Sequence, residues 1–316
     1  MDLYRDYFTR EQLLLSLAQA QYIPGQLAEH FETLEDVYST SIPIEELAKD
    51  AVSPSDPVPR GAPSDPMALG KARVVPFETK TYSREIPVLA DSVLNARRPG
   101  SMGAEVMAHR RDRAAEKLRN WADIQHEWLR VSCVNAPSNA FGTAPGDAVV
   151  AFGANDSAIR SALHTSVVQP LEAALDGLTY TGIDAYCSDA FWLGLIESKT
   201  IKETYLGYAA AAELRGQTAN SFVYGDIAWH RYRPQGGIKI ADGRCKIVPR
   251  GVPGLLVQAF APDDTNESVG EGLASEPYYL RAFPIPDDKG WRLKMQTHPV
   301  MVCTRPEAIQ TLKLTA

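Results

Sequence analysis

The sequence is poor in cysteine and has no long apolar run among its 316 residues. No apolar stretch approaches the roughly 20 residues that a membrane-spanning helix needs, and the N-terminus lacks the basic start of a signal peptide. We therefore expect neither a membrane span nor a cleaved leader. Only four cysteines occur, too far apart for metal-ligand spacing: Cys133, Cys187, Cys245 and Cys303. They are expected to be separate buried thiols of a reducing compartment, with no metal and no cofactor.

Sequence motifs for catalysis are also missing, because there is no glycine-rich phosphate loop and no G-x-S-x-G nucleophile elbow. Cys187 precedes the start of an expected helix, a position that favours a thiolate, but no base for it is visible. Four histidines fall in expected helices or strands, where packing is their ordinary role: His126, His164, His230 and His298. A soluble α+β enzyme that uses Cys187 or a histidine remains an alternative interpretation.

The net charge of −7 is concentrated at the N-terminal end of the chain. Residues 1–50 hold ten acidic and three basic residues, so the remaining residues are balanced. Tight, extensive binding of nucleic acid needs a positive field, which a balanced body does not supply. Weak, nonspecific contact with nucleic acid is compatible with this charge. Residues 1–50 alternate short helical pieces with turns and are expected to form an arm that lies on something else.

Residues 104–130 carry the longest uninterrupted helical pattern. They contain no proline or glycine, and a helix of this length would run ~40 Å. Its apolar residues have the spacing of one buried face: Met107, Ala114, Leu118, Trp121, Ala122, Trp128 and Leu129. Five acidic residues share a stripe nearly opposite that face: Glu105, Asp112, Glu116, Asp123 and Glu127. A charged stripe is usually a solvated face, but here we interpret it as a rail on which another subunit docks.

Residues 51–99 have the composition of an extended loop. The first part holds five prolines between Ala51 and Pro66, and the second part is expected to form strands that the prolines keep out of central ladder positions. The segment has too little apolar surface for a core of its own, and loops of this length are usually functional. Its basic residues are candidates for contact with another subunit: Arg60, Lys71, Arg73, Lys80 and Arg84.

The remaining sequence mixes helices with antiparallel strands, which indicates the α+β class. We expect strands near 134–152 and at 178–188, and a helix from about 157 to 176. Pro170 is expected to kink this helix or to end its first half. The segment FVYGDIAWHRYR is expected to be one strand that turns at PQGG into IKIADGRCKIV. Strands are also expected at 254–262 and, with strict alternation of faces, from Trp291 onward.

The order of these segments resembles the major capsid proteins of tailed bacteriophages, specifically the lambda-like capsid protein E family with the HK97-type fold. The resemblance rests on an ordered set of stretches: FTREQLLLSLAQAQYIPG, PVPRGAP with VVPFETKTYSREI, the long helix after ARRPGS, FVYGDIAWHRYRPQGG, VPGLLVQAFAPDDTNESVGEGLASEPYY and WRLKMQTHPVMVCTRPEAIQTLKL. The chain departs from the family pattern at Asp226, where the family has glycine.

The resemblance implies an N-arm, an extended E-loop, a peripheral domain with a long spine helix, and an axial domain. Their expected ranges are 1–50 for the N-arm, 51–99 for the E-loop, 100–176 for the peripheral domain with its spine helix at 104–130, 177–276 for the axial domain, and 277–316 for the return to the peripheral domain. From these ranges we expect the basic residues of the E-loop to pair with the acidic stripe of a neighbour's spine helix.

The implied function is a structural one. The chain would self-assemble, as hexamers and pentamers, into an icosahedral head shell that encloses double-stranded DNA. It would be made in the host cytoplasm and end in the virion, with a decoration protein, a scaffold and a portal as further partners. An encapsulin-type nanocompartment, which shares the fold but encloses protein cargo, is the alternative.

Overall fold

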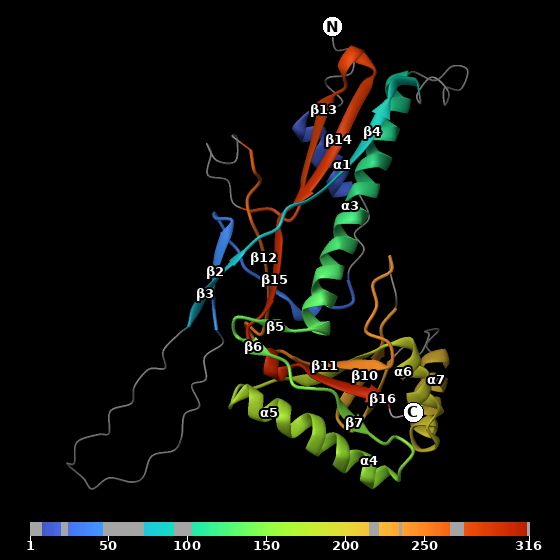
Figure 1. Ribbon diagram of the computed structural model, residues 1–316. Helices are drawn as coiled ribbons and strands as arrows, with labels where there is room; N and C mark the ends of the chain where they lie inside the picture. The colour runs from blue at the N-terminus through green and yellow to red at the C-terminus, as the bar shows by residue number, and fades with distance from the viewer. Residues whose placement is uncertain are drawn as a thin grey trace, which may run out of the picture.

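The computed structural model describes residues 8–19, 25–46, 73–91, 103–214, 221–233, 236–265 and 275–314. Within these ranges the protein is elongated, with α3 (Gly103–Asn135) running from one tip to a wider domain at the other end (Figure 1). None of the helices in the described ranges combines the length and the apolar character that crossing a membrane would require. The architecture is α+β, as expected from the sequence.

The upper part is a three-stranded antiparallel sheet covered by two helices. The sheet order is β13 (Tyr279–Pro284), β14 (Gly290–Thr297) and β4 (Tyr82–Leu89), and α1 (Arg10–Gln19) packs with α3 beside it. The alternation expected from Trp291 onward is confirmed, since Leu293 and Met295 of β14 are fully buried between the sheet and the helices. Residues 82–89 are thus part of a sheet and not of a projecting loop.

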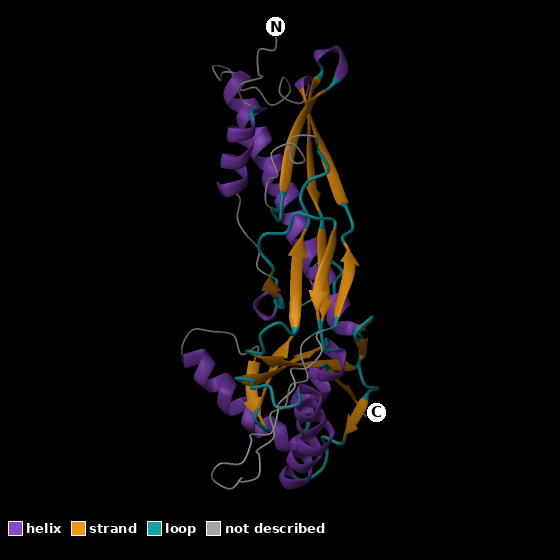
Figure 2. Cartoon of the chain, turned by 90° about the vertical axis from the view of Figure 1, so that its left-hand side faces the viewer, coloured by secondary structure: helices purple, strands orange, loops and turns teal. Residues whose placement is uncertain are grey.

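The middle part is a second sheet with a two-stranded ribbon beside it, and Figure 2 shows the two sheets following one another along the long helix. In this sheet β12 (Leu256–Phe260) lies between β1 (Glu32–Thr33), which is parallel to it, and β15 (Pro299–Cys303), which is antiparallel. The short helix η2 (Ala28–His30) precedes β1. The ribbon pairs β2 (Ser41–Glu45) with β3 (Val74–Glu78), and its inner face contributes Ile42, Ile44, Val75 and Phe77 to a core shared with Phe141 and Val302.

The wide domain contains a six-stranded mixed sheet in the order β7 (Ala148–Val150), β16 (Gln310–Leu314), β11 (Arg244–Arg250), β8 (Gly182–Cys187), β10 (Ile227–Arg231) and β9 (Ser221–Tyr224). Its helices are α4 (Asp156–Leu163), the π-helical η3 (His164–Val168), α5 (Gln169–Leu175), α6 (Asp189–Glu197) and α7 (Lys199–Leu214). Small elements complete the chain: β5 (Ser138–Asn139), β6 (Gly142–Thr143), η4 (Pro286–Asp288) and η5 (Pro306–Ala308). The large core of this wide domain includes Phe191, Phe222 and Trp229.

Three sequence-based expectations about local structure are wrong. The long helix continues to Asn135, so Val134 lies in it, where a strand was expected to begin. The segment FVYGDIAWHRYR forms a hairpin, since Gly225 (φ 62°) and Asp226 (φ 63°) both adopt the left-handed conformation of a type I′ turn. The strands on either side of PQGG do not pair, because β8 lies between β10 and β11.

The helix expected from 157 to 176 is present as three successive segments, α4, η3 and α5, and Pro170 lies in the first turn of the last one. Because proline lacks an N–H and crowds the carbonyl four residues earlier, it disturbs an α-helix from within. Here the wider π-helical segment η3 ends just before it, so that Pro170 falls in the first turn of the renewed helix α5. Further on, the Oγ of Ser188 accepts a hydrogen bond from the N–H of Phe191 and caps α6.

Candidate assembly surfaces

The ribbon of β2 and β3 is the base of the proline-rich segment. Residues 47–72, which connect the two strands in sequence, lie outside the described residues, and Arg60 and Lys71 lie outside with them. Of the other predicted contact residues, Arg73 already has an acidic neighbour in its own chain, with Nη1 4.0 Å from Oε2 of Glu46. Lys80 is exposed at the end of the ribbon.

Two prolines face each other across this ribbon, with Pro43 opposite Pro76. The N–H of Glu46 donates to the carbonyl of Arg73 at 2.7 Å, and that of Thr79 to the carbonyl of Thr40 at 3.0 Å. Because hydrogen-bonded and non-hydrogen-bonded pairs alternate in an antiparallel ladder, the proline pair falls at a non-hydrogen-bonded position. The missing N–H groups therefore lie on the outer edges of the ribbon, and the ladder between the strands loses nothing.

Arg84 lies on β4 and has a partner on its own long helix. Its guanidinium carbon is 5.8 Å from the ring centre of Trp121, a cation–π contact worth about 0.5–1 kcal/mol at an exposed site. Arg84 is nonetheless exposed on one side. This contact helps to hold the sheet against α3, so intersubunit pairing is not needed to explain the residue.

The acidic stripe on α3 is divided between two environments. In the first half of the helix, Asp112 has a 44% exposed side chain and Glu116 is exposed, as predicted. Asp112 also accepts a hydrogen bond from Oγ of Ser16 on α1 at 2.7 Å. It forms an ion pair with the neighbouring Arg111, whose Nη2 lies 2.7 Å from Oδ1. The side chain of Glu105 lies outside the described residues.

In the second half of α3 the prediction of an outward stripe is wrong. Asp123 and Glu127 are 5% and 2% exposed. The hydroxyl of Tyr278 donates to Asp123, while Glu127 accepts hydrogen bonds from the N–H of Leu27 at 3.2 Å and the hydroxyl of Tyr232 at 3.1 Å. Both carboxylates are thus occupied within their own chain.

The reason is that the helix changes its buried face midway. The buried residues of the first half are Met107, Arg111, Ala114, Ala115, Leu118 and Ala122, and those of the second half are Asp123, His126, Glu127, Arg130, Val131 and Val134. At about 100° per residue, the centres of these two faces differ by roughly 140°. Trp128, expected to be buried, is accordingly 46% exposed. The first face meets the upper sheet, and the second meets the N-terminal segment and β15.

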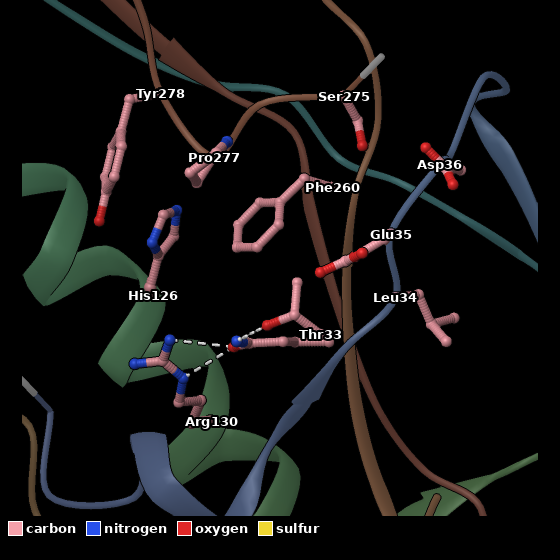
Figure 3. A pocket seen from close by; sticks show the side chains of 11 residues that line it. Thr33, Leu34, Glu35, Asp36, His126, Arg130, Phe260, Ser275, Pro277 and Tyr278 are labelled. Carbon is pink, nitrogen blue, oxygen red and sulfur yellow. Dashed lines mark hydrogen bonds between the residues drawn. The ribbon is translucent and has the colours of Figure 1, made fainter.

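A hollow of about 410 Å³ lies beside this second face (Figure 3). Its walls come from the segment Thr33–Asp36, from α3 through His126 and Arg130, and from Phe260 and Pro277. The guanidinium of Arg130 donates to Oε1 of Gln258 at 2.9 and 3.1 Å, so these donors are occupied. The apolar part of its lining is Leu34, Phe260 and Pro277, and among the polar groups Gln258 links Arg130 to Thr33.

His126 in this hollow does not activate the hydroxyl that it contacts. Its Nε2 is 2.8 Å from Oγ1 of Thr297, and that hydroxyl donates to the carbonyl of Pro277 at 2.8 Å. The hydroxyl proton is thus used, so Nε2 of His126 must carry the proton of the shared hydrogen bond. Burial, with a smaller effect from Arg130, lowers the pKa of His126 to about 3. The ring is neutral and structural.

A buried charge cluster, which the sequence did not reveal, joins η2 to the six-stranded sheet. The fully buried carboxylate of Asp184 on β8 accepts hydrogen bonds from both Nε and Nη2 of Arg250, and Nε2 of His230 lies 3.2 Å away. Nε2 of His30 is 3.5 Å from the same carboxylate and 2.8 Å from the hydroxyl of Tyr186. Burial alone would raise the pKa of Asp184, but the hydrogen bonds from His230 and Arg250 bring it to about 2.

Two groups in the described ranges have the donor types of a cation site: Glu29, His30 and Asp184, and Asp263, Asp264 and His298. In each group the buried aspartate is already paired with arginine, Asp184 with Arg250 and Asp263 with Arg281 at 2.6 Å. A guanidinium in contact with the carboxylate opposes a second cation there. We assign neither group as a metal site.

The cysteine and the remaining histidines do not form a catalytic arrangement. Cys187 is fully buried, and burial raises the pKa of its thiol well above the ordinary value, the opposite of an activated nucleophile. His164 is exposed on η3, His230 is bonded to Asp184, and Nδ1 of His298 is 2.9 Å from Oγ1 of Thr81. These environments give no support to the enzyme interpretation.

Comparison with known proteins gives the family. The family model described as phage major capsid protein E matches residues 9–314. The mature capsid of bacteriophage PhiM1 is similar in structure, with 13% identity, a TM-score of 0.52, and 94% of this chain and 89% of that chain covered. For the capsid of cyanophage P-SCSP1u these values are 9%, 0.57, 93% and 90%. For the putative capsid protein of a prophage of E. coli CFT073 they are 12%, 0.56, 96% and 98%. No curated protein sequence matches the chain.

Proposed function

Because this chain belongs to the phage major capsid protein E family and has the HK97-type fold, we propose that it assembles as hexamers and pentamers into an icosahedral head that encloses double-stranded DNA. The chain is a structural component of the virion that forms the head shell, and not an enzyme. The family match over residues 9–314 is the observation that carries the proposal. With the charge of the body balanced, contact with the DNA would be weak and sensitive to salt.

We assign residues 1–50 to the N-arm, 100–176 to the peripheral domain, 177–276 to the axial domain and 277–316 to the return to the peripheral domain. The E-loop was expected at 51–99. Because β4 is hydrogen-bonded to β14 along Tyr82–Leu89, we place the end of the projecting part before Tyr82. The β2–β3 ribbon would then be the stalk on which the E-loop reaches a neighbouring subunit.

We keep the proposal that the E-loop pairs with the long helix of a neighbouring subunit, but with fewer acidic residues. Asp123 and Glu127 are buried, so the acidic surface available on α3 is that of Asp112 and Glu116. We propose that Lys80 of one subunit lies against Glu116 of the next. A single surface ion pair contributes little, about 0–1 kcal/mol. Repetition in every subunit of a closed shell makes the sum significant.

Charge reversal tests this pairing. Lys80→Glu and Glu116→Lys are each expected to reduce the yield of closed particles, since they place like charges together, and the double variant should restore it. Lys80→Glu combined with Glu203→Lys, an exposed residue on α7 at the other end of the molecule, is the mismatched control and should not restore assembly. A double variant that assembles no better than the single variants would argue against the pairing.

A decoration protein, a scaffold and a portal are the further partners that we propose. The encapsulin-type alternative predicts protein cargo in place of DNA. Negative-stain microscopy of the expressed full-length chain tests the main proposal, which expects closed shells of uniform diameter and is contradicted by a small, monodisperse oligomer. Nucleic acid or protein inside purified particles then distinguishes the two kinds of shell.

A further inference from the structure

Two of the four cysteines, which the sequence separates by 58 positions, lie side by side in the centre of the six-stranded sheet. Cys187 on β8 is the register partner of Cys245 on β11, and the two Sγ atoms are 3.3 Å apart. Both residues are fully buried, and neither is in a disulfide. Their wide spacing predicted separate thiols, because strand register is not visible in the sequence.

The ladder places this pair where a cross-strand bond is sterically feasible. In the adjacent pair, the N–H of Ser188 donates to the carbonyl of Arg244 at 3.0 Å. Cys187 and Cys245 therefore occupy a non-hydrogen-bonded position, where facing Cα atoms are about 4.5 Å apart and side chains are closest. Disulfides span Cα distances of about 4.4–6.8 Å. The backbone therefore already has a Cα separation that a disulfide can span, and only rotation of the two side chains is needed to bring the sulfur atoms to bonding distance.

We propose that Cys187 and Cys245 form a reversible intramolecular disulfide when the folded chain meets a two-electron oxidant of the peroxide class. One thiol, as the thiolate, attacks an oxygen of hydrogen peroxide, which forms an S–O bond, breaks the O–O bond and releases one water. The second thiolate attacks that sulfur, which forms the S–S bond, breaks the S–O bond and releases a second water. The two sulfur atoms are oxidised by two electrons in total, and the peroxide is reduced to two waters.

Burial determines when this bond can form. The raised pKa of the Cys187 thiol keeps the thiolate scarce, and the absence of exposed sulfur surface admits only small oxidants or brief local opening. The thiols therefore stay reduced in a reducing cytoplasm and oxidise slowly in an oxidising medium. The bond would close a ring from β8 to β11 that contains α6, α7, β9 and β10, and would tie these elements to the centre of the sheet.

The test uses the unassembled full-length chain, so its outcome is independent of shell formation. The folded chain is treated with hydrogen peroxide, quenched, denatured and titrated for free thiols, with peptide mass spectrometry to locate the link. We expect two of four thiols to remain and a Cys187–Cys245 peptide pair lighter by two hydrogens, which dithiothreitol restores. Oxidised chain should also melt about 5 °C higher than reduced chain.

Variants separate this pair from the other two cysteines. Cys303→Ser keeps the pair and should lose two of its three thiols, whereas Cys187→Ser should keep all three and show no dithiothreitol-dependent melting shift. Because the mass measurement on the unmodified chain requires no variant, poor folding of either variant does not remove the test. Four remaining thiols, a link between Cys133 and Cys303, or oxidation only to sulfinic acid would each overturn the proposal.

Discussion

Oε1 of Glu127, in the second half of the long helix, accepts a hydrogen bond from the backbone N–H of Leu27 at 3.2 Å. The same oxygen accepts from the hydroxyl of Tyr232 at 3.1 Å, and Arg130 lies 3.5 Å from the other oxygen. One buried carboxylate thus joins the N-terminal segment, α3 and the end of β10. A Cβ at Gly25 would collide with this carboxylate, so a larger residue there would displace it.

Removing this carboxylate should destabilise the folded chain more than removing any exposed acid of the same helix. Glu127→Ala leaves the N–H of Leu27 and the hydroxyl of Tyr232 without their acceptor in a buried site and removes the ion-pair partner of Nη1 of Arg130, which we expect to cost about 3 kcal/mol. Urea denaturation of the unassembled chain measures the loss. Glu116→Ala, on the exposed part of α3, should change stability by less than about 0.5 kcal/mol. Equal effects from the two substitutions would refute this role of Glu127.

The two facing prolines of the ribbon are expected to protect the folded chain against aggregation. Pro43 and Pro76 remove an N–H from each outer edge, and edges that lack donors are poor templates for additional strands. The double variant with Pro43→Val and Pro76→Val restores both donors and adds β-branched side chains. We expect it to form β-rich aggregates faster, measured by light scattering and thioflavin fluorescence at constant concentration.

The control for this experiment is Pro286→Val, at an exposed proline that begins η4 and is outside any ladder. It should leave the aggregation rate unchanged. If the double variant is as soluble as the unmodified chain, the prolines are not edge protection. Their role would then be confined to setting the conformation of the ribbon.

The sequence predicted those features that depend on local periodicity. The uninterrupted pattern of residues 104–130 indicated the long helix, and the alternation of Leu293 and Met295 with charged residues indicated the inward face of β14. The first pattern depends only on the absence of helix-breaking residues, and the second reports one packing partner along the strand. The class and the order of elements followed from such patterns and from the family resemblance.

What the sequence could not show depends on contacts between distant segments. A helical stripe reveals its exposed side only if one face stays buried, and α3 changes partners near Ala122, so that Asp123 and Glu127 turn inward. The contact between Cys187 and Cys245 also depends on strand order, because β8, which carries Cys187, lies directly beside β11, which carries Cys245. The cluster around Asp184 likewise gathers residues from η2, β8, β10 and β11. No spacing in the sequence predicts any of these contacts.

Acidification is expected to destabilise the folded chain below about pH 6.5, because two histidines are buried in their neutral form. Burial, with a smaller effect from Arg130, lowers the pKa of His126 to about 3, and burial is also the main cause that lowers the pKa of His30. A group whose pKa is lower in the folded chain than its ordinary 6.5 contributes stability above that pH and loses it as the pH falls toward the folded value. His126 alone should cost about 1.4 kcal/mol per pH unit below about pH 6.

Urea midpoints measured at intervals between pH 7 and 4 test this expectation. Asp184, whose pKa is lowered to about 2 in the folded chain, adds to the slope only below about pH 5, where the unfolded carboxyl begins to take up protons, and this part is the same in the His126→Gln variant. His126→Gln keeps a donor for Thr297 but cannot titrate, so the fall in stability with pH should become shallower by the amount that His126 contributes. His164→Gln, at an exposed position on η3, should leave the slope as it is. If His126→Gln and the unmodified chain lose stability in parallel, the buried ring is not the group that makes the fold sensitive to acid.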